Sequence, residues 1–361
     1  MTTDVGSLRK KLDDFLALVD GDHSITDDGP LREVCRDVEA MLSKGLSPEV
    51  VHLADRVFRY LGQEGLKKRI PFHREYVAVA PDPDERFWSH WHLVDSLAVL
   101  RRNPEAVEEQ NRLYRWTCEN QSDEHILRAL EDTTQARCWL MEGRIDEWFK
   151  LYEEASNRLA SPEVSHYWRC NFLRAGAAVY TLADNLDKAL IELSKLDVCI
   201  QNKTQWEHYR VFWLAIVTSR LEIFRKQRKW GEFDLTAKEG VSFVEVELAR
   251  MTAGKPTDVD LLAWVAHDLG CCMFWAGRYE TAESLLRTAI SAKDDAGHHF
   301  FLSACIWAGR KDRKKTLFEL RTAQSFIRNS LNRGGYYNYF LETPEFSDVW
   351  EDPEFLAVLG Q

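Results

Sequence analysis

The chain has 361 residues, and 45% of them are hydrophobic, which is enough apolar side chain for a continuous core. Acidic residues (58) outnumber basic residues (47), and the formal net charge of −11 at pH 7 argues against a general nucleic-acid-binding protein. The low counts of glycine (18) and proline (10) favour long helices over a sheet-rich fold.

No apolar run approaches the length of a membrane-spanning helix, and the first residues lack the apolar core of a signal peptide. The eight cysteines form no Cys-x-x-Cys pair, and most occupy apolar helix positions, which is typical of core residues in a reducing compartment. We therefore expect a cytoplasmic protein that crosses no membrane and needs no cofactor.

Residues 1–70 predict an N-terminal helical segment of two or three helices, divided at Asp27–Pro30. Ser47-Pro48-Glu49 is typical of a helix start, because it supplies an N-cap, a proline in the first turn and an acid near the positive end of the helix dipole. Ser161-Pro162-Glu163 repeats this pattern. Residues 69–84, which include a strand-like alternation at 76–80, predict a non-helical stretch.

From residue 84 onwards, a pattern of helix face, turn and second helix face recurs. Its clearest copy spans 270–290, where small or apolar residues stand seven and four positions before Gly277 and five, nine and twelve after it. The same offsets recur around Arg101, Gly143, Asp184, Arg228 and Gly309. The exceptions are Gln110, Lys314 and Arg321. Each copy predicts an antiparallel helix pair, and recurrence of such a pair indicates a solenoid.

The segments 276–290, 141–155 and 182–196 resemble the turn and second helix of tetratricopeptide (TPR) repeats. The resemblance covers roughly residues 84–330, but the turns are 42, 41, 44, 49 and 32 residues apart, against about 34 in the family. A TPR-like superhelix and another helical-hairpin solenoid both fit this spacing. The resemblance implies an all-α, right-handed α-solenoid of antiparallel helix hairpins that binds other molecules and performs no catalysis.

The tail predicts a C-terminal cap. Asn332–Gly335 ends a helix, an aromatic run follows at Tyr336–Phe340, and two short segments then open at Pro344 and Pro353. Solenoids need such a cap over their last exposed hydrophobic face. The predicted organisation is therefore an N-terminal helical segment (1–70), a TPR-like array (84–330) and a cap (331–361).

In TPR-like pairs the first helices line a concave groove, and the repeat spacing predicts which residues face it. Arginine and asparagine side chains there suit a carboxylate or phosphate, and aromatic side chains act as anchors. The predicted partner-binding residues are Trp88, Trp91, Arg137, Asn171, Arg174, Arg225, Trp264, His267, Phe274 and His299. They favour a non-catalytic adaptor or regulatory subunit that binds a protein or peptide. A sensor that closes around a signal peptide is the alternative within binding proteins.

Two basic runs, Arg225–Lys229 and Arg310–Lys315, stand out against the acidic background. Their charge suits an acidic protein or a nucleic-acid-containing complex. Solvated helix ends are the other interpretation, because basic side chains favour the negative end of a helix dipole.

A helical metalloenzyme is the remaining alternative. Glu49 with His52 and Glu163 with His166 repeat the Glu-x-x-His spacing of di-metal bundles, yet helix capping explains both copies. His298-His299 with Asp294 and Asp295 could supply one or two metal ligands, which is too few for a site, and His267 beside Cys271 or Cys272 lacks a third orienting group. Phosphate-binding loops and the common hydrolase motifs are absent from the sequence. We therefore predict no catalytic residue and no metal site.

Overall fold

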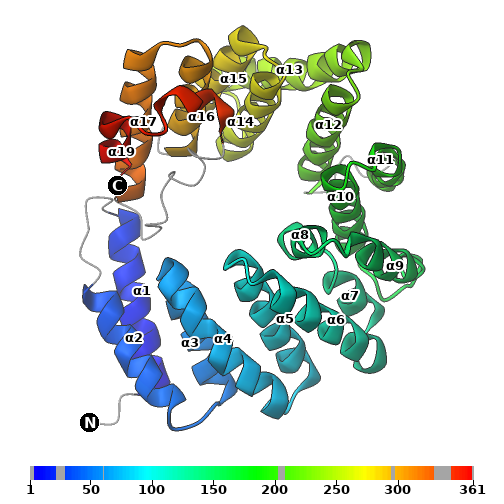
Figure 1. Cartoon of the computed structure of the whole chain (residues 1–361), viewed down its shortest axis with the longest axis vertical. Helices are drawn as coiled ribbons and strands as arrows, with labels where there is room; N and C mark the ends of the chain where they lie inside the picture. The colour runs from blue at the N-terminus through cyan, green and yellow to red at the C-terminus, as the bar shows by residue number, and fades with distance from the viewer. Residues whose placement is uncertain are drawn as a thin grey trace. The chain divides into compact units, whose positions relative to one another are not determined.

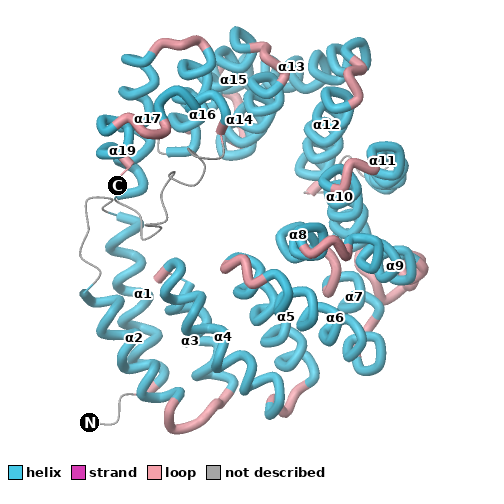
Figure 2. Tube along the Cα trace, viewed as in Figure 1, coloured by secondary structure: helices cyan, strands magenta, loops and turns pink. Residues whose placement is uncertain are grey.

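A computed structural model describes residues 4–21, 29–59, 61–201, 208–293, 297–328 and 343–359. Within these ranges the chain folds into helices joined by short turns, and no strand is present (Figure 2). The predicted all-α fold is confirmed. No helix in the described ranges has both the length and the apolar character needed to cross a membrane.

The chain forms two compact units that divide between residues 216 and 217, inside helix α12 (Tyr209–Lys226). The sequence predicted a different partition, into residues 1–70, 84–330 and 331–361, which stays a prediction.

The first unit is a succession of helices in which neighbours along the chain pack against each other, α4 on α5, α5 on α6 and α10 on α11 (Figure 1). They are α1 (Val5–Gly21), α2 (Gly29–Leu42), α3 (Pro48–Arg59), α4 (Gly62–Val79), α5 (Pro83–Val99), α6 (Asn103–Asn120), α7 (Asp123–Arg128), α8 (Thr133–Met141), α9 (Ile145–Ser156), α10 (His166–Leu182), α11 (Leu186–Ile200) and the first part of α12.

The second unit continues the same arrangement, with α14 packed on α15 and α16 on α17. Its elements are the rest of α12, α13 (Trp230–Thr252), α14 (Val259–Trp275), α15 (Tyr279–Ala292), α16 (Gly297–Gly309), α17 (Arg313–Arg328), the 3₁₀ helix η1 (Pro344–Val349) and α19 (Pro353–Val358).

The hairpin turns share one backbone conformation. A single residue with positive φ ends the first helix, at Arg101 (57°), Gly143 (68°), Asp184 (60°), Arg228 (56°), Gly277 (72°) and Lys311 (61°). The amide after each of them donates to the carbonyl five residues earlier, as Arg278 does to Met273 at 2.8 Å. This bonding closes the helix end by satisfying carbonyls that have no partner within the helix. Five of the six predicted turns are thereby confirmed at their predicted residues.

The sixth turn lies at Lys311, two residues after the predicted Gly309. Gly309 is the last residue of α16, and a Cβ atom there would lie 2.8 Å from Oη of Tyr279, so this glycine permits close packing and makes no turn. Counting from Lys311, the offsets fall on buried Thr316, Leu320 and Ala323. Lys314 and Arg321, both exposed, did not fit the pattern because the offsets had been counted from Gly309 instead of Lys311. Gly277 and Lys311 are 34 residues apart, which is the TPR period.

Gln110, the other exception, fits the pattern as a buried polar residue. Its amide nitrogen donates to the carbonyl of Ala129 and to Oε1 of Gln135, both at 3.0 Å, and its oxygen accepts from Nε1 of Trp139 at 2.6 Å. A fully buried amide is tolerated because these bonds replace those it would make with water.

Two local predictions were wrong. Residues 69–79 belong to α4, with Pro71 inside the helix, because Ile70, Phe72 and Tyr76 are buried on its packed face and their burial outweighs the proline penalty. The segment 161–163 forms a turn, and α10 begins later, at His166.

Of the predicted C-terminal cap (331–361), the structure describes residues 343–359. Phe346 of η1 and Phe355 of α19 are fully buried, and these elements pack on α16 and α17 respectively. Arg313 of α17 pairs with Asp352 at 2.8 Å and with Glu354 at 3.0 Å. The aromatic run at 336–340 lies outside the described residues.

Candidate functional site

In the first unit, the first helices of successive hairpins lie next to each other, α5 against α8 and α8 against α10. The predicted partner-binding residues of this unit all belong to these helices. They are Trp88 and Trp91 on α5, Arg137 on α8, and Asn171 and Arg174 on α10. We call this set, together with Arg128, Glu131 and Trp168, the arginine–tryptophan surface.

Arg128, at the end of α7, connects tryptophans from two hairpins. Its guanidinium carbon lies 5.3 Å from the ring centre of Trp88 and 4.0 Å from that of Trp168, at cation–π distance from both. Trp91 meets Trp88 edge to face at 6.3 Å. Sequence reasoning missed Arg128 and Trp168, because α7 is an extra short helix and neither residue stands at an offset of the repeat. The result is a row of half-buried aromatic side chains across α5 and α10.

Glu131, Asn171 and Arg174 form a polar chain beside this row. Asn171 donates from Nδ2 to Glu131, and Arg174 donates from Nε and Nη2 to Oδ1 of Asn171 at 3.0 and 2.9 Å. Burial raises the pKa of Glu131 to about 7, although the Asn171 hydrogen bond and the charges of Arg128 and Arg174 act to lower it. Neither Arg174 nor the exposed Arg137 forms an ion pair with any carboxylate in the described ranges.

The raised pKa of Glu131 makes the stability of the first unit depend on pH. Between about pH 4.5 and 7 the folded chain holds a proton on Glu131 that the unfolded chain has released, so this contribution to stability falls as the pH rises. We expect Glu131→Gln, which mimics the protonated acid, to gain on the order of 2 kcal/mol over wild type between pH 5 and pH 8. Urea unfolding of both proteins at the two pH values measures this, and an equal difference at both would contradict it.

In the second unit, Arg225 lines a cavity of ≈ 250 Å³ between α12 and α14. Glu222, Asp268, Cys271 and Cys272 are among its other lining residues. Burial raises the pKa of Asp268 to about 6, against the effect of a hydrogen bond from Trp264. Trp264 and Phe274 were both predicted to face a partner; Trp264 is 40% exposed, whereas Phe274 is only 3% exposed. We leave Phe274 out of the proposed surface, because it packs on Tyr279.

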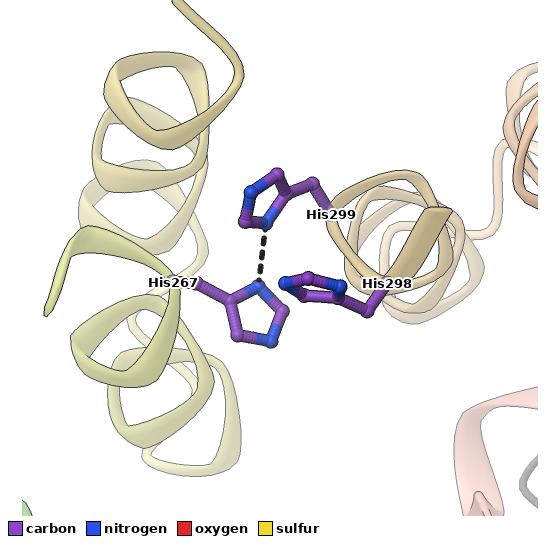
Figure 3. A group of neighbouring side chains, drawn as sticks. All are labelled: His267, His298 and His299. Atoms are coloured by element: carbon purple, nitrogen blue, oxygen red, sulfur yellow. Dashed lines mark hydrogen bonds between the residues drawn. The ribbon is translucent and has the colours of Figure 1, made fainter. Parts of the chain in front are cut away.

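His267 and His299 were predicted to face a partner, and the structure places them in contact with each other. His267 lies in α14 and His299 in the first turn of α16, with 3.1 Å between their Nδ1 atoms (Figure 3). His299 is only 1% exposed, so it too drops out of the open surface. Burial, together with the charges of His298 and His299, lowers the pKa of His267 to about 3, so the imidazole is neutral at physiological pH.

The basic run at 310–315 is largely neutralised within the second unit. Arg310 pairs with Glu283, Lys311 with Asp348 at 2.6 Å, and Arg313 with the cap. Lys315 lies 3.9 Å from Asp312. This run therefore acts mainly to hold the cap and α15, and it leaves little free charge for a nucleic acid.

The residues of the metalloenzyme alternative are not brought together. His52 lies 3.4 Å from Glu85, and Glu163 stands in the turn before α10. Among the described residues, Glu49, His52, Glu163 and His166 belong to no cluster with metal-ligand spacing.

No protein-family model matches the sequence, and a search of curated proteins found no match. Among solved structures, the chain is similar to BtubC (BKLC) from P. vanneervenii, at 14% identity and a TM-score of 0.42, over 65% of this chain and 91% of that one. It is also similar to the human IFIT1 dimer with PPP-AAAA, at 16% identity and a TM-score of 0.47, over 92% and 74%. The Cut9–Hcn1 hetero-tetramer of APC/C shows 9% identity and a TM-score of 0.28, over 90% and 59%.

With all three TM-scores below 0.5, these similarities carry no information about partners. The positive-φ turns and the buried repeat positions define the class of the fold directly. It is a TPR-like stack of antiparallel helix hairpins, as the sequence resemblance implied.

Proposed function

We propose that the protein is a non-catalytic adaptor or regulatory subunit that binds another polypeptide on the first-helix faces of its hairpins. The arginine–tryptophan surface of the first unit is the proposed contact, and the partner segment is one that carries carboxylate groups. The single observation that carries this proposal concerns the ion pairing of Arg137 and Arg174. Neither forms an ion pair with a described carboxylate, in a chain whose acids outnumber its bases by 58 to 47.

The chemistry of this surface suits a polypeptide. Arg174 is held by two hydrogen bonds to Asn171, which reduces the conformational entropy that binding would cost. Trp88 and Trp91 are half-buried, so each retains exposed ring surface for a partner side chain. Tryptophan and arginine are the residue types that contribute most at protein interfaces.

The test is a comparison of peptide binding by matched variants. Peptides rich in aspartate and glutamate, selected from a displayed library on the wild-type protein, should bind the Arg137→Ala/Arg174→Ala variant at least about 100-fold more weakly, because two charge-assisted hydrogen bonds are lost. Arg115→Ala is the control, since Arg115 is an exposed arginine on α6, a second helix. Equal affinity of wild type and double variant, at unchanged melting temperature, would reject this surface as the binding site.

The second unit is tested separately, with Arg225→Ala. A loss of binding with this variant alone would move the proposed contact to the cavity that Arg225 lines. Steep weakening of nucleic-acid binding by salt, with no peptide selected, would favour the nucleic-acid alternative instead.

A further inference from the structure

Three histidines of the second unit converge, although the sequence places His267 more than thirty residues before His298 and His299. Each offers a ring nitrogen, and these three atoms all lie within 4.8 Å of one another. Figure 3 shows the two rings from α16 turned towards the ring from α14. We propose that His267, His298 and His299 form a binding site for one divalent transition-metal ion, with Zn²⁺ as the best match.

The spacing of the nitrogens supports a shared ion. Two imidazole nitrogens on one tetrahedral zinc ion, each about 2.0 Å from it, are roughly 3.3 Å apart. The Nδ1 atoms of His267 and His299 are already 3.1 Å apart. The ring centre of His298 lies 4.5 Å from that of His267 and 4.2 Å from that of His299, which brings a third imidazole to the same place.

The donor set selects the class of metal. Three imidazole ligands suit zinc, copper or nickel, whereas calcium and magnesium require oxygen ligands. Zinc sites with three histidines keep a fourth position open for water or another molecule. Exposed His298 marks the side from which an ion would enter, whereas His299 is buried.

Cys271 supplies the positioning group for such a site. Its Sγ lies 3.6 Å from Nε2 of His267, on the other edge of the ring from Nδ1. With a metal on Nδ1, the proton of His267 would occupy Nε2 and donate to this sulfur, which fixes the tautomer and the ring orientation. Because Cys271 also lines the cavity beside Arg225, the site adjoins that cavity.

The site would join two hairpins. His267 belongs to the first helix of one pair (α14–α15), and His298 and His299 belong to the first helix of the next (α16–α17). An ion held by both would stabilise the second unit, and above the Kd this stabilisation would grow with the logarithm of the free ion concentration. The inference is independent of the proposed function, because the zinc assay requires no partner and the peptide assay requires no metal.

Equilibrium dialysis with ZnCl₂ alone tests the site. We expect one Zn²⁺ per wild-type chain, and a loss of affinity in His298→Gln greater than the roughly 10–100-fold that removal of an outer-shell partner costs. His52→Gln is the control, since His52 is also exposed and lies in the first unit. Wild-type protein without stoichiometric zinc, or His298→Gln with wild-type affinity, would overturn the proposal.

The role of Cys271 has its own readout. Co²⁺ in place of Zn²⁺ should give the intense visible absorption of a tetrahedral site in the wild type. Cys271→Ala should weaken metal binding about 10–100-fold, and Cys271→Ser, which keeps an acceptor for the His267 proton, should restore most of it. Equal affinities in the alanine and serine variants would remove Cys271 as the positioning residue.

Discussion

Asp55→Ala is expected to lower the free energy of unfolding by about 3–5 kcal/mol, because it removes the closest counter-ion of the buried Arg69 guanidinium and leaves, among the described residues, only Asp95, 3.6 Å away. The side chain of Arg69 is only 3% exposed, and its Nη2 lies 2.6 Å from Oδ1 of Asp55. His73, also buried, lies 3.0 Å from the same oxygen. Burial acts to raise the pKa of Asp55, but the His73 hydrogen bond and the charges of His92 and Arg69 hold it well below its usual range.

Asp14→Ala is the matched control for this experiment. Asp14 is an exposed carboxylate on α1, and its removal should change stability by no more than about 0.5 kcal/mol. Urea denaturation followed by circular dichroism measures both variants. If Asp55→Ala were as stable as Asp14→Ala, the network around Arg69 would contribute nothing to the packing of α3 against α4.

Gly176→Ala should cost about 3–5 kcal/mol, through overpacking and a broken hydrogen bond. A Cβ atom at this position in α10 would lie 2.0 Å from Oη of Tyr152. That ring cannot retreat, because it stacks on Phe172 at 4.4 Å and on Trp148 at 5.2 Å. Its hydroxyl also donates to the buried Glu192 at 2.9 Å, so displacement of the ring would leave a buried carboxylate short of a donor.

Gly231→Ala is the control, and we expect it to increase stability where Gly176→Ala decreases it. Gly231 lies in the first turn of α13, and nothing stands within 4 Å of the position its Cβ would take. Alanine should therefore stabilise this helix by up to about 1 kcal/mol. Thermal unfolding of the two variants separates a steric effect at Gly176 from a general cost of adding a methyl group. A melting temperature of Gly176→Ala equal to that of wild type would contradict the predicted clash.

Much of the fold could be predicted from the sequence because a helix hairpin is a local object. Its packed positions recur at fixed offsets from one turn, and five of six turns were found at the residue that adopts positive φ. The errors arose where a local signal had two interpretations. Glycine is common in turns, but Gly309 permits close contact with Tyr279. Proline commonly ends a helix, but Pro71 stands inside α4. In both places tertiary packing outweighed local preference.

The candidate sites, too, were predicted only where they depend on local sequence. The repeat frame placed Trp88, Trp91, Asn171 and Arg174 on first helices, where the structure has them. The repeat offsets could not predict that Arg128 lies between two tryptophans, or that His267 lies close to His298 and His299. Such contacts join hairpins, and their geometry depends on how far one helix pair is rotated against the next.

By itself, then, the sequence of this protein determined an all-α stack of antiparallel hairpins and the register of most turns, because a helix must bury one face at a period that its residues display. Only the tertiary structure decided which polar side chains meet across hairpins, whether Arg137 and Arg174 pair with a carboxylate of the described residues, and where three imidazoles lie together. Those outcomes depend on distances between segments far apart in the chain, and no pattern along the chain encodes such distances.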